Sequence, residues 1–112
     1  MPKIGEEREP LSEPVFLILT SLAEEPRHGY ALMADIDALS NGRVRLSTGT
    51  LYGALSRLLE AGRIERFASD DTARDKRWYR LTPAGRALLA ADVERLRQLT
   101  RAASARLRTK EV

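Results

Sequence analysis

Residues 47–60 carry short polar side chains at a spacing that places them on one side of a helix. At about 100° per residue, Leu51, Leu55 and Leu58 point to a common apolar side. The opposite side then holds small, hydroxyl-bearing and charged residues, namely Gly49, Thr50, Gly53, Ser56, Arg57 and Glu60. Hydroxyl and guanidinium groups on such a slim face can hydrogen-bond to base edges in a major groove about 12 Å wide. An ordinary solvated helix face has the same composition, so the pattern alone leaves both interpretations open.

The two glycines on this face are costly for a helix. Gly49 and Gly53 each lower helix stability by about 1 kcal/mol relative to alanine. Glycine at such positions suggests that another surface approaches the helix closely.

The sequence contains few residues that could perform covalent catalysis or bind a metal ion. The sequence has no cysteine and one histidine, His28. Without cysteine there is no disulfide, no thiolate ligand and no thiol nucleophile. The sequence also lacks a glycine-rich phosphate loop and a recognisable cluster of acids and bases. We therefore expect no enzyme activity, no cofactor and no metal site.

Positive charge is concentrated in the middle and end of the chain. Residues 1–26 hold two basic and six acidic side chains, residues 27–86 hold eleven and seven, and residues 87–112 hold six and three. Sixteen of the nineteen basic residues are arginine, whose planar fork suits phosphates and guanine edges. An arginine-rich composition can equally reflect genomic base bias, so the charge only points to the middle segment as the nucleic-acid face.

The first element that must support this face is a helix over residues 13–25. Ser12 is a favourable N-cap, and Pro14 fits a first helical turn. Pro26 ends the helix, because proline cannot donate the next backbone hydrogen bond.

Two further helices follow. One begins near His28 and ends at Gly42; the next carries the polar face, begins after Ser47 or Thr48 and ends at Gly62. Their expected buried residues are Leu32, Ile36 and Leu39 in the first, and Leu51, Leu55, Leu58 and Leu59 in the second.

A hairpin is expected next, with strands over residues 64–68 and 76–82 and a polar tip between them. Its basic residues are Arg74, Lys76 and Arg77. If the hairpin is the wing of a DNA-binding domain, these basic residues would contact DNA phosphates at its tip. Asp70, Asp71 and Asp75 lie in the same loop and would repel the phosphates. In the second strand, Tyr79 and Leu81 alternate with Trp78 and Arg80. We expect Trp78 to pack under the hairpin or the last helix, with a DNA or ligand contact as the alternative.

The last helix, over residues 83–108, is about 39 Å long at 1.5 Å per residue. This length exceeds what the rest of the domain could cover. Apolar and small residues recur at coiled-coil spacing along it, namely Leu89, Val93, Leu96, Thr100, Ala103 and Leu107, with Leu99 beside them. The stripe predicts self-association into a two-fold dimer; the alternative is a helix that folds back on its own domain.

Three helices, a hairpin and a long helix form a mainly α fold with a small β-hairpin, the winged helix-turn-helix with a C-terminal dimerisation helix. We expect a flexible arm over residues 1–11, the DNA-binding domain over 12–82, and the dimerisation helix and tail over 83–112. The longest strongly apolar stretch has five residues, whereas a membrane span needs about 20. We therefore expect a cytoplasmic protein with no membrane partner.

Three blocks of the sequence resemble the signature of the PadR family of transcriptional regulators. They are HGY at residues 28–30, STGTLYGALSRLLEAGRI at residues 47–64 and WYRLTPAGR at residues 78–86. Each block is weak alone, but their order and spacing are specific. Two features depart from the family pattern. Family members commonly have proline where Gly53 stands, and their wing tips tend to be basic and to contain glycine or proline where this one has three aspartates.

The resemblance implies a repressor that reads an inverted repeat in double-stranded DNA. It places Ser47, Thr48, Thr50, Tyr52 and Arg57 at or near the groove, and Arg74, Lys76 and Arg77 near the backbone. For Tyr30 it implies a phosphate contact, with a core position as the equal alternative. The single last helix is the family's short form. If the protein has a small apolar or aromatic effector, it would lie at the dimer interface between the first and last helices, lined by Phe16, Leu17, Val93 and Leu96; plain core packing is the alternative for these residues. A winged helix used for protein contacts alone is the rival function.

Overall fold

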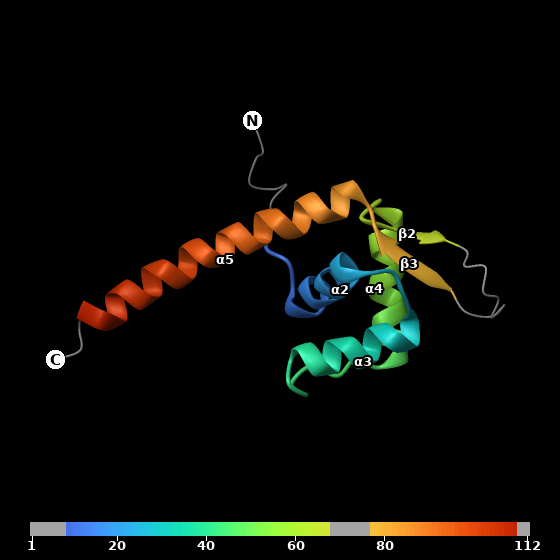
Figure 1. The fold of residues 1–112 in the computed structure, drawn as a ribbon, viewed down its shortest axis with the longest axis horizontal. Helices are drawn as coiled ribbons and strands as arrows, with labels where there is room; N and C mark the ends of the chain where they lie inside the picture. Colours follow the sequence, from blue (N-terminus) through green and yellow to red (C-terminus); the bar gives the residue numbers. More distant parts are fainter. Residues whose placement is uncertain (1–8, 68–76, 110–112) are drawn as a thin grey trace.

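The computed structural model describes residues 9–67 and 77–109 (Figure 1). Its elements, in chain order, are α2 (Glu13–Glu24), β1 (Arg27–His28), α3 (Gly29–Leu39), α4 (Thr48–Glu60), β2 (Ile64–Phe67), β3 (Trp78–Leu81) and α5 (Pro83–Thr109). The predicted order of three helices, a hairpin and a last helix is confirmed, with β1 as an addition. Most of the expected N-terminal arm and the tip of the wing, including Arg74 and Lys76, lie outside the described residues.

Local capping explains where the three short helices begin. The Ser12 Oγ accepts a hydrogen bond from the Val15 N–H at 3.3 Å, and the Ser47 Oγ accepts one from the Thr50 N–H at 3.1 Å. Each satisfies a backbone donor that the first helical turn leaves without a partner. The His28 Nδ1 accepts from the Ala31 N–H in the same way, at 3.3 Å.

The small sheet has three antiparallel strands in the order β1-β3-β2. In the hairpin, Ile64 faces Leu81 and Phe67 faces Trp78. Strand β1 was not predicted from the sequence; it has only two residues and pairs with the edge of β3 opposite β2. Trp78 is half-buried, and its ring packs edge-on against the His28 ring, with the ring centroids 5.1 Å apart. The centroid of the Phe67 ring lies 6.1 Å from that of the Trp78 ring.

One apolar core joins the helices to the sheet. Its buried members come from α2, α3, α4, β2 and β3: Ile18, Leu19, Leu22, Leu32, Ile36, Leu51, Ala54, Leu55, Leu58, Ile64 and Tyr79. The leucines predicted to be buried in α4 are there, with Leu59 partly buried at the edge. Leu39 is the exception, because it is the last residue of α3 and is 46% exposed. The prediction that Leu39 belongs to the buried face was wrong.

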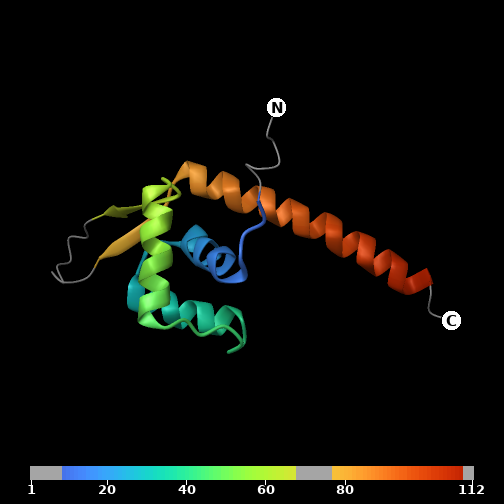
Figure 2. The ribbon, with the colours of Figure 1, turned by 180° about the vertical axis from the view of Figure 1, so that it is seen from behind.

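The long helix α5 extends well beyond the other elements (Figures 1 and 2). Leu88 and Leu89 in its first half pack against the core. From Leu96 onward nearly every residue is exposed, including Leu99 at 53% and Leu107 at 73%. Among the described residues, no helix combines the length and the apolar character needed to cross a bilayer.

Candidate nucleic-acid interface

The outer side of α4 is an open, polar face. Its exposed residues are Ser47, Thr48, Gly49, Thr50, Tyr52, Ser56, Arg57 and Glu60, while Gly53 is half-buried. The Ser47 Oγ lies 3.0 Å from the Thr50 Oγ1, to which it donates while it caps the helix. Within the described residues, this leaves the Thr50 hydroxyl hydrogen available to an outside acceptor. Among the described residues no carboxylate forms an ion pair with Arg57.

Packing within the chain does not explain the two glycines on this face. A Cβ atom added to Gly49 would meet nothing within 4 Å, and one added to Gly53 would meet only the Arg57 Nη1 at 3.8 Å. Neither residue has a positive φ angle. Alanine would therefore fit both positions in the isolated protein.

Tyr52 connects α4 to the beginning of α3. A Cβ atom on Gly29 would lie 2.1 Å from the Tyr52 Oη and 2.8 Å from its Cζ, so a larger residue there would displace this ring from its position. Tyr52 keeps 38% of its surface exposed. The contact therefore positions its side chain at the edge of the polar face. Gly29, directly after the His28 cap, was the one sign of this contact in the sequence.

Tyr30 is 75% exposed, which excludes the core position considered for it. It lines a shallow hollow of about 230 Å³ together with Met33, Ala34, Asp37, Arg45 and Leu46. Arg45, which the sequence analysis did not select, stands two residues before the α4 cap, and its Nε lies 3.7 Å from an Asp37 carboxylate oxygen. Tyr30 and Arg45 thus lie on one exposed surface.

The two arginines of the link between α3 and α4 differ in their partners. Arg43 forms a two-pronged ion pair with Glu13 at the start of α2, with its Nη1 3.0 Å from the Glu13 Oε1. This hydrogen bond lowers the pKa of Glu13 and raises the pKa of Arg43. Arg43 is therefore already neutralised within the protein, whereas Arg45 has only a loose contact with Asp37.

The described part of the wing has exposed arginines on both strands. Arg77 is exposed directly before β3, and Arg66 is exposed on β2. Arg80 is held by the Glu65 carboxylate at 2.7 Å and lies over the Phe67 ring. Arg77 and Arg66 have no comparable ion pair within the described residues.

The predicted stripe on α5 divides into two parts. Leu89 and Val93 are half-buried against the domain, whereas Leu96, Leu99, Thr100, Ala103 and Leu107 are exposed. Both parts lie on one continuous helix. The exposed part is left without a cover within the described protomer.

Two hollows, which include part of this stripe, are lined by Phe16, Leu17, Val93 and Leu96. Phe16, Leu17 and Leu96 line one of about 370 Å³ between α2 and α5. Phe16, Val93 and Leu96 line an open one of about 390 Å³ further along α5. The structure therefore brings all four predicted effector-lining residues to the same region.

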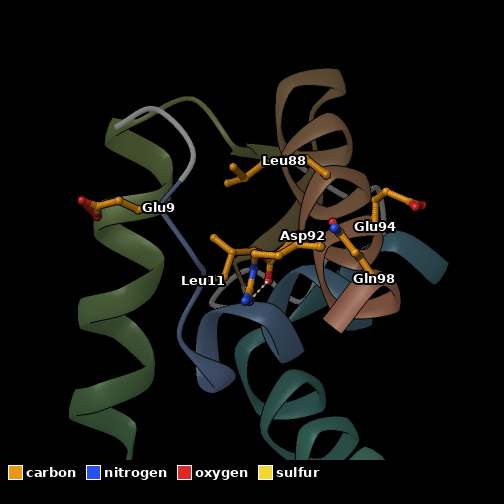
Figure 3. Close-up of a pocket in the computed structure, with 8 residues that line it drawn as sticks. Glu9, Leu11, Leu88, Asp92, Glu94 and Gln98 are labelled. Carbon is orange, nitrogen blue, oxygen red and sulfur yellow. Dashed lines mark hydrogen bonds and ion pairs between the residues drawn. The ribbon is translucent and has the colours of Figure 1, made fainter. Parts of the chain in front are cut away.

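A polar pair that the sequence analysis missed borders the first hollow. Asp92 is only 6% exposed, and the Arg95 Nε donates to its Oδ1 at 2.8 Å. The hydrogen bond to Asp92 raises the pKa of Arg95. Figure 3 shows Asp92 and Leu88 from α5 facing Leu11, from the segment before α2, in an adjoining pocket of about 190 Å³. The spacing of three residues between Asp92 and Arg95 on a helix was the feature of the sequence that could have predicted this pair.

Known proteins resemble the chain in sequence and in fold. Residues 18–91 match the Transcriptional regulator PadR-like family. The chain belongs to this family. A "Transcriptional regulator Rv3488" from Mycobacterium tuberculosis is 39% identical to this PadR-like chain over 84 residues, covering 75% of the chain and 76% of the relative. An uncharacterised 37.1 kDa protein in transposon Tn4556 of Streptomyces fradiae is 43% identical over 84 residues, which cover 75% of the chain but only 23% of that protein.

Solved structures show the same fold. A PadR family transcription regulator from Clostridium difficile superposes with a TM-score of 0.72 at 20% identity, covering 86% of this PadR-like chain and 99% of that one. A probable transcriptional regulator from Pseudomonas aeruginosa gives a TM-score of 0.65 at 31% identity, covering 87% and 67%. The predicted family and the winged helix fold are confirmed. PadR-like proteins are transcription regulators, so the expectation that the chain is not an enzyme is confirmed as well.

Proposed function

We propose that this PadR-like chain is a sequence-specific DNA-binding repressor that binds an inverted repeat as a homodimer. The observation that carries the proposal is the outer face of α4. It is polar and open, and it contains two glycines that the fold of the protomer does not require. Close approach to the floor of a major groove explains both features, because a helix without bulky side chains can lie deeper in the groove.

We assign the residues on and around this face to base contacts or to phosphate contacts according to their position. Thr50, with a free hydroxyl hydrogen, and Arg57, without an ion pair among the described residues, are suited to base edges. Ser47 and Thr48 stand at the N-terminus of α4, where backbone N–H groups and hydroxyls favour phosphate oxygens. The exposed side chains of Tyr30, Tyr52 and Arg77 lie further out and would contact the DNA backbone. Arg74 and Lys76 would add wing contacts from outside the described residues.

The exposed part of the α5 stripe supports the homodimer. Leu96, Leu99 and Leu107 leave apolar surface in water, and burial against a second copy would remove it. Coiled-coil spacing favours a helix as the partner surface. On this proposal residues 12–82 bind DNA and residues 83–112 hold the dimer together.

Gly53→Ala separates the groove function from protein stability. We expect the free energy of unfolding to rise by about 1 kcal/mol, because alanine is the better helix former and nothing in the protomer obstructs its Cβ. DNA affinity should fall about tenfold, because the added methyl group holds α4 away from the bases. Urea unfolding and fluorescence anisotropy measure the two effects. If stability rises with unchanged affinity, Gly53 does not face the groove.

Salt dependence tests the proposed function directly. We expect the protein to bind the DNA upstream of its own gene. Its affinity should fall by roughly 1,000-fold between 50 and 200 mM salt if about six phosphates are neutralised, because binding releases their counterions. A winged helix that contacts only proteins would show no binding even at low salt.

A small effector would act at the other end of the molecule. The hollows lined by Phe16, Leu17, Val93 and Leu96 lie beside the stripe that we assign to the dimer, and their apolar residues suit an apolar or aromatic compound. Such a compound would release DNA by changing how the two α5 helices meet. Phenolic and dye-like compounds are the probes, and failure of all of them to raise the melting temperature or release DNA would exclude this kind of sensing.

A further inference from the structure

The end of α4 and the beginning of α5 lie close together (Figures 1 and 2). The chain leaves α4 through Gly62, whose φ is +76° and whose N–H donates to the Leu59 carbonyl at 3.0 Å. The carbonyls of Gly62 and Arg63 then accept hydrogen bonds from Thr82. Its Oγ1 donates to the Gly62 oxygen at 2.7 Å, and its N–H donates to the Arg63 oxygen at 3.1 Å.

Gly85 allows the backbone of α5 to lie directly against the backbone of residue 63. It is buried in the first turn of α5, and its N–H donates to the Thr82 Oγ1 at 3.0 Å. A Cβ atom at this position would lie 2.0 Å from the Arg63 carbonyl oxygen and 2.9 Å from the Leu81 Cδ1. The closest obstacle is a backbone oxygen, which cannot turn away as a flexible side chain could.

We propose that this contact, made by Gly62, Arg63, Thr82 and Gly85, is a rigid joint that fixes the angle between α4 and α5. In the dimer, this angle sets the distance between the two α4 helices, which we assign to the major groove. The distance in turn sets the spacing of the DNA half-sites that the protein accepts. Thr82 and Gly85 are the positioning residues. The inference rests on the proposed homodimer, and it adds a determinant of operator spacing that touches no DNA.

The length of α5 makes the joint angle important. Its 27 residues span about 40 Å, so a tilt of about 10° at the first turn moves the far end by about 7 Å. That displacement equals about two base-pair steps of 3.4 Å. The exposed part of the dimer stripe lies far from the joint, toward the C-terminal end, so a small change at the joint becomes a large change between the two α4 helices. Leu88 and Leu89 support α5 along its first half, which leaves the joint to fix its starting point.

The absence of cysteine from the sequence allows a direct measurement. Ser56→Cys places one nitroxide label on the exposed face of each α4, and pulsed electron-electron resonance then measures the distance between the two protomers. In this background we compare Gly85→Ala, which adds one atom inside the joint, with Ala84→Ser, which adds one atom at its exposed neighbour. Thr82→Val removes the hydroxyl at nearly equal size, and Thr82→Ser retains it. Thermal melting establishes which variants fold.

We expect Gly85→Ala and Thr82→Val to shift the distance by about 5 Å or more, or to broaden it by a similar amount. Thr82→Ser and Ala84→Ser should keep the parent distance. The shifted variants should also prefer half-site spacers changed by about one or two base pairs. If Gly85→Ala does not fold, the comparison of Thr82→Val with Thr82→Ser decides alone.

Folded joint variants that keep the parent distance would overturn the joint while leaving the proposed dimer in place. A parent Ser56→Cys protein without any coupling between labels would instead overturn the homodimer, and with it both proposals. A loss of melting temperature with an unchanged distance would show that Thr82 and Gly85 only stabilise the fold.

Discussion

Leu96→Asp should convert the homodimer into folded monomers and lower operator affinity by roughly 100-fold or more. Leu96 is 37% exposed in the protomer, so a carboxylate there remains in water when the chain is alone. In a dimer seam the same carboxylate would be buried without a partner and opposite its own copy, which costs several kcal/mol. Losing the link between two half-sites removes the avidity gain of about 100-fold or more. Light scattering after gel filtration measures the mass.

The matched control for this experiment is Gln98→Asp. Gln98 is exposed on the same helix, outside the stripe, and receives the same charge. It should stay dimeric. A Leu96→Asp protein that also stays dimeric would show that the dimer contact does not run along this stripe of α5.

Arg57→Ala should lower affinity for the operator by about 10- to 100-fold and affinity for random DNA only slightly. A bidentate arginine contact with a base contributes about 1–3 kcal/mol of discrimination. Arg57 lies on the exposed face of α4 and forms no ion pair among the described residues, so it can reach a base without first breaking a bond within the protein. Competition binding with operator and random duplexes measures both affinities.

Arg77→Ala is the comparison for Arg57→Ala, because Arg77 is also an exposed arginine and is assigned to the DNA backbone. Its loss should weaken binding to both duplexes about equally and reduce the salt dependence by about one phosphate contact. If Arg57→Ala also weakens both equally, Arg57 contacts phosphate and does not read sequence.

Features set by neighbouring residues could be predicted from the sequence. The caps Ser12 and Ser47 act on N–H groups three residues ahead, and Gly62 ends α4 with a positive φ, so the helix boundaries agree closely with the prediction. The polar face of α4 follows from helical periodicity alone. The alternation in β3 likewise predicted that Tyr79 and Trp78 face different ways, and Tyr79 is the buried one.

Contacts between distant segments could not be predicted in this way. The strand β1 exists only because residues 27–28 pair with β3, about 50 positions later. The close approach of the Tyr52 ring to Gly29 joins two helices, and the requirement for glycine at residue 85 depends on the Arg63 carbonyl. Periodicity also predicted that Leu39 lies in the core. It is exposed, because α3 ends at this residue. Such features depend on how elements pack, which no local pattern contains.

Hydroxyl-radical footprinting of the DNA upstream of the protein's own gene, at low salt, tests the central claim that paired α4 helices read an inverted repeat. We expect two protected segments of related, inverted sequence, with centres about 34 Å apart along the duplex. Protection should be lost with Leu96→Asp at concentrations where Gln98→Asp retains it. No protection at low salt, or a single protected segment without an inverted partner, would contradict the account.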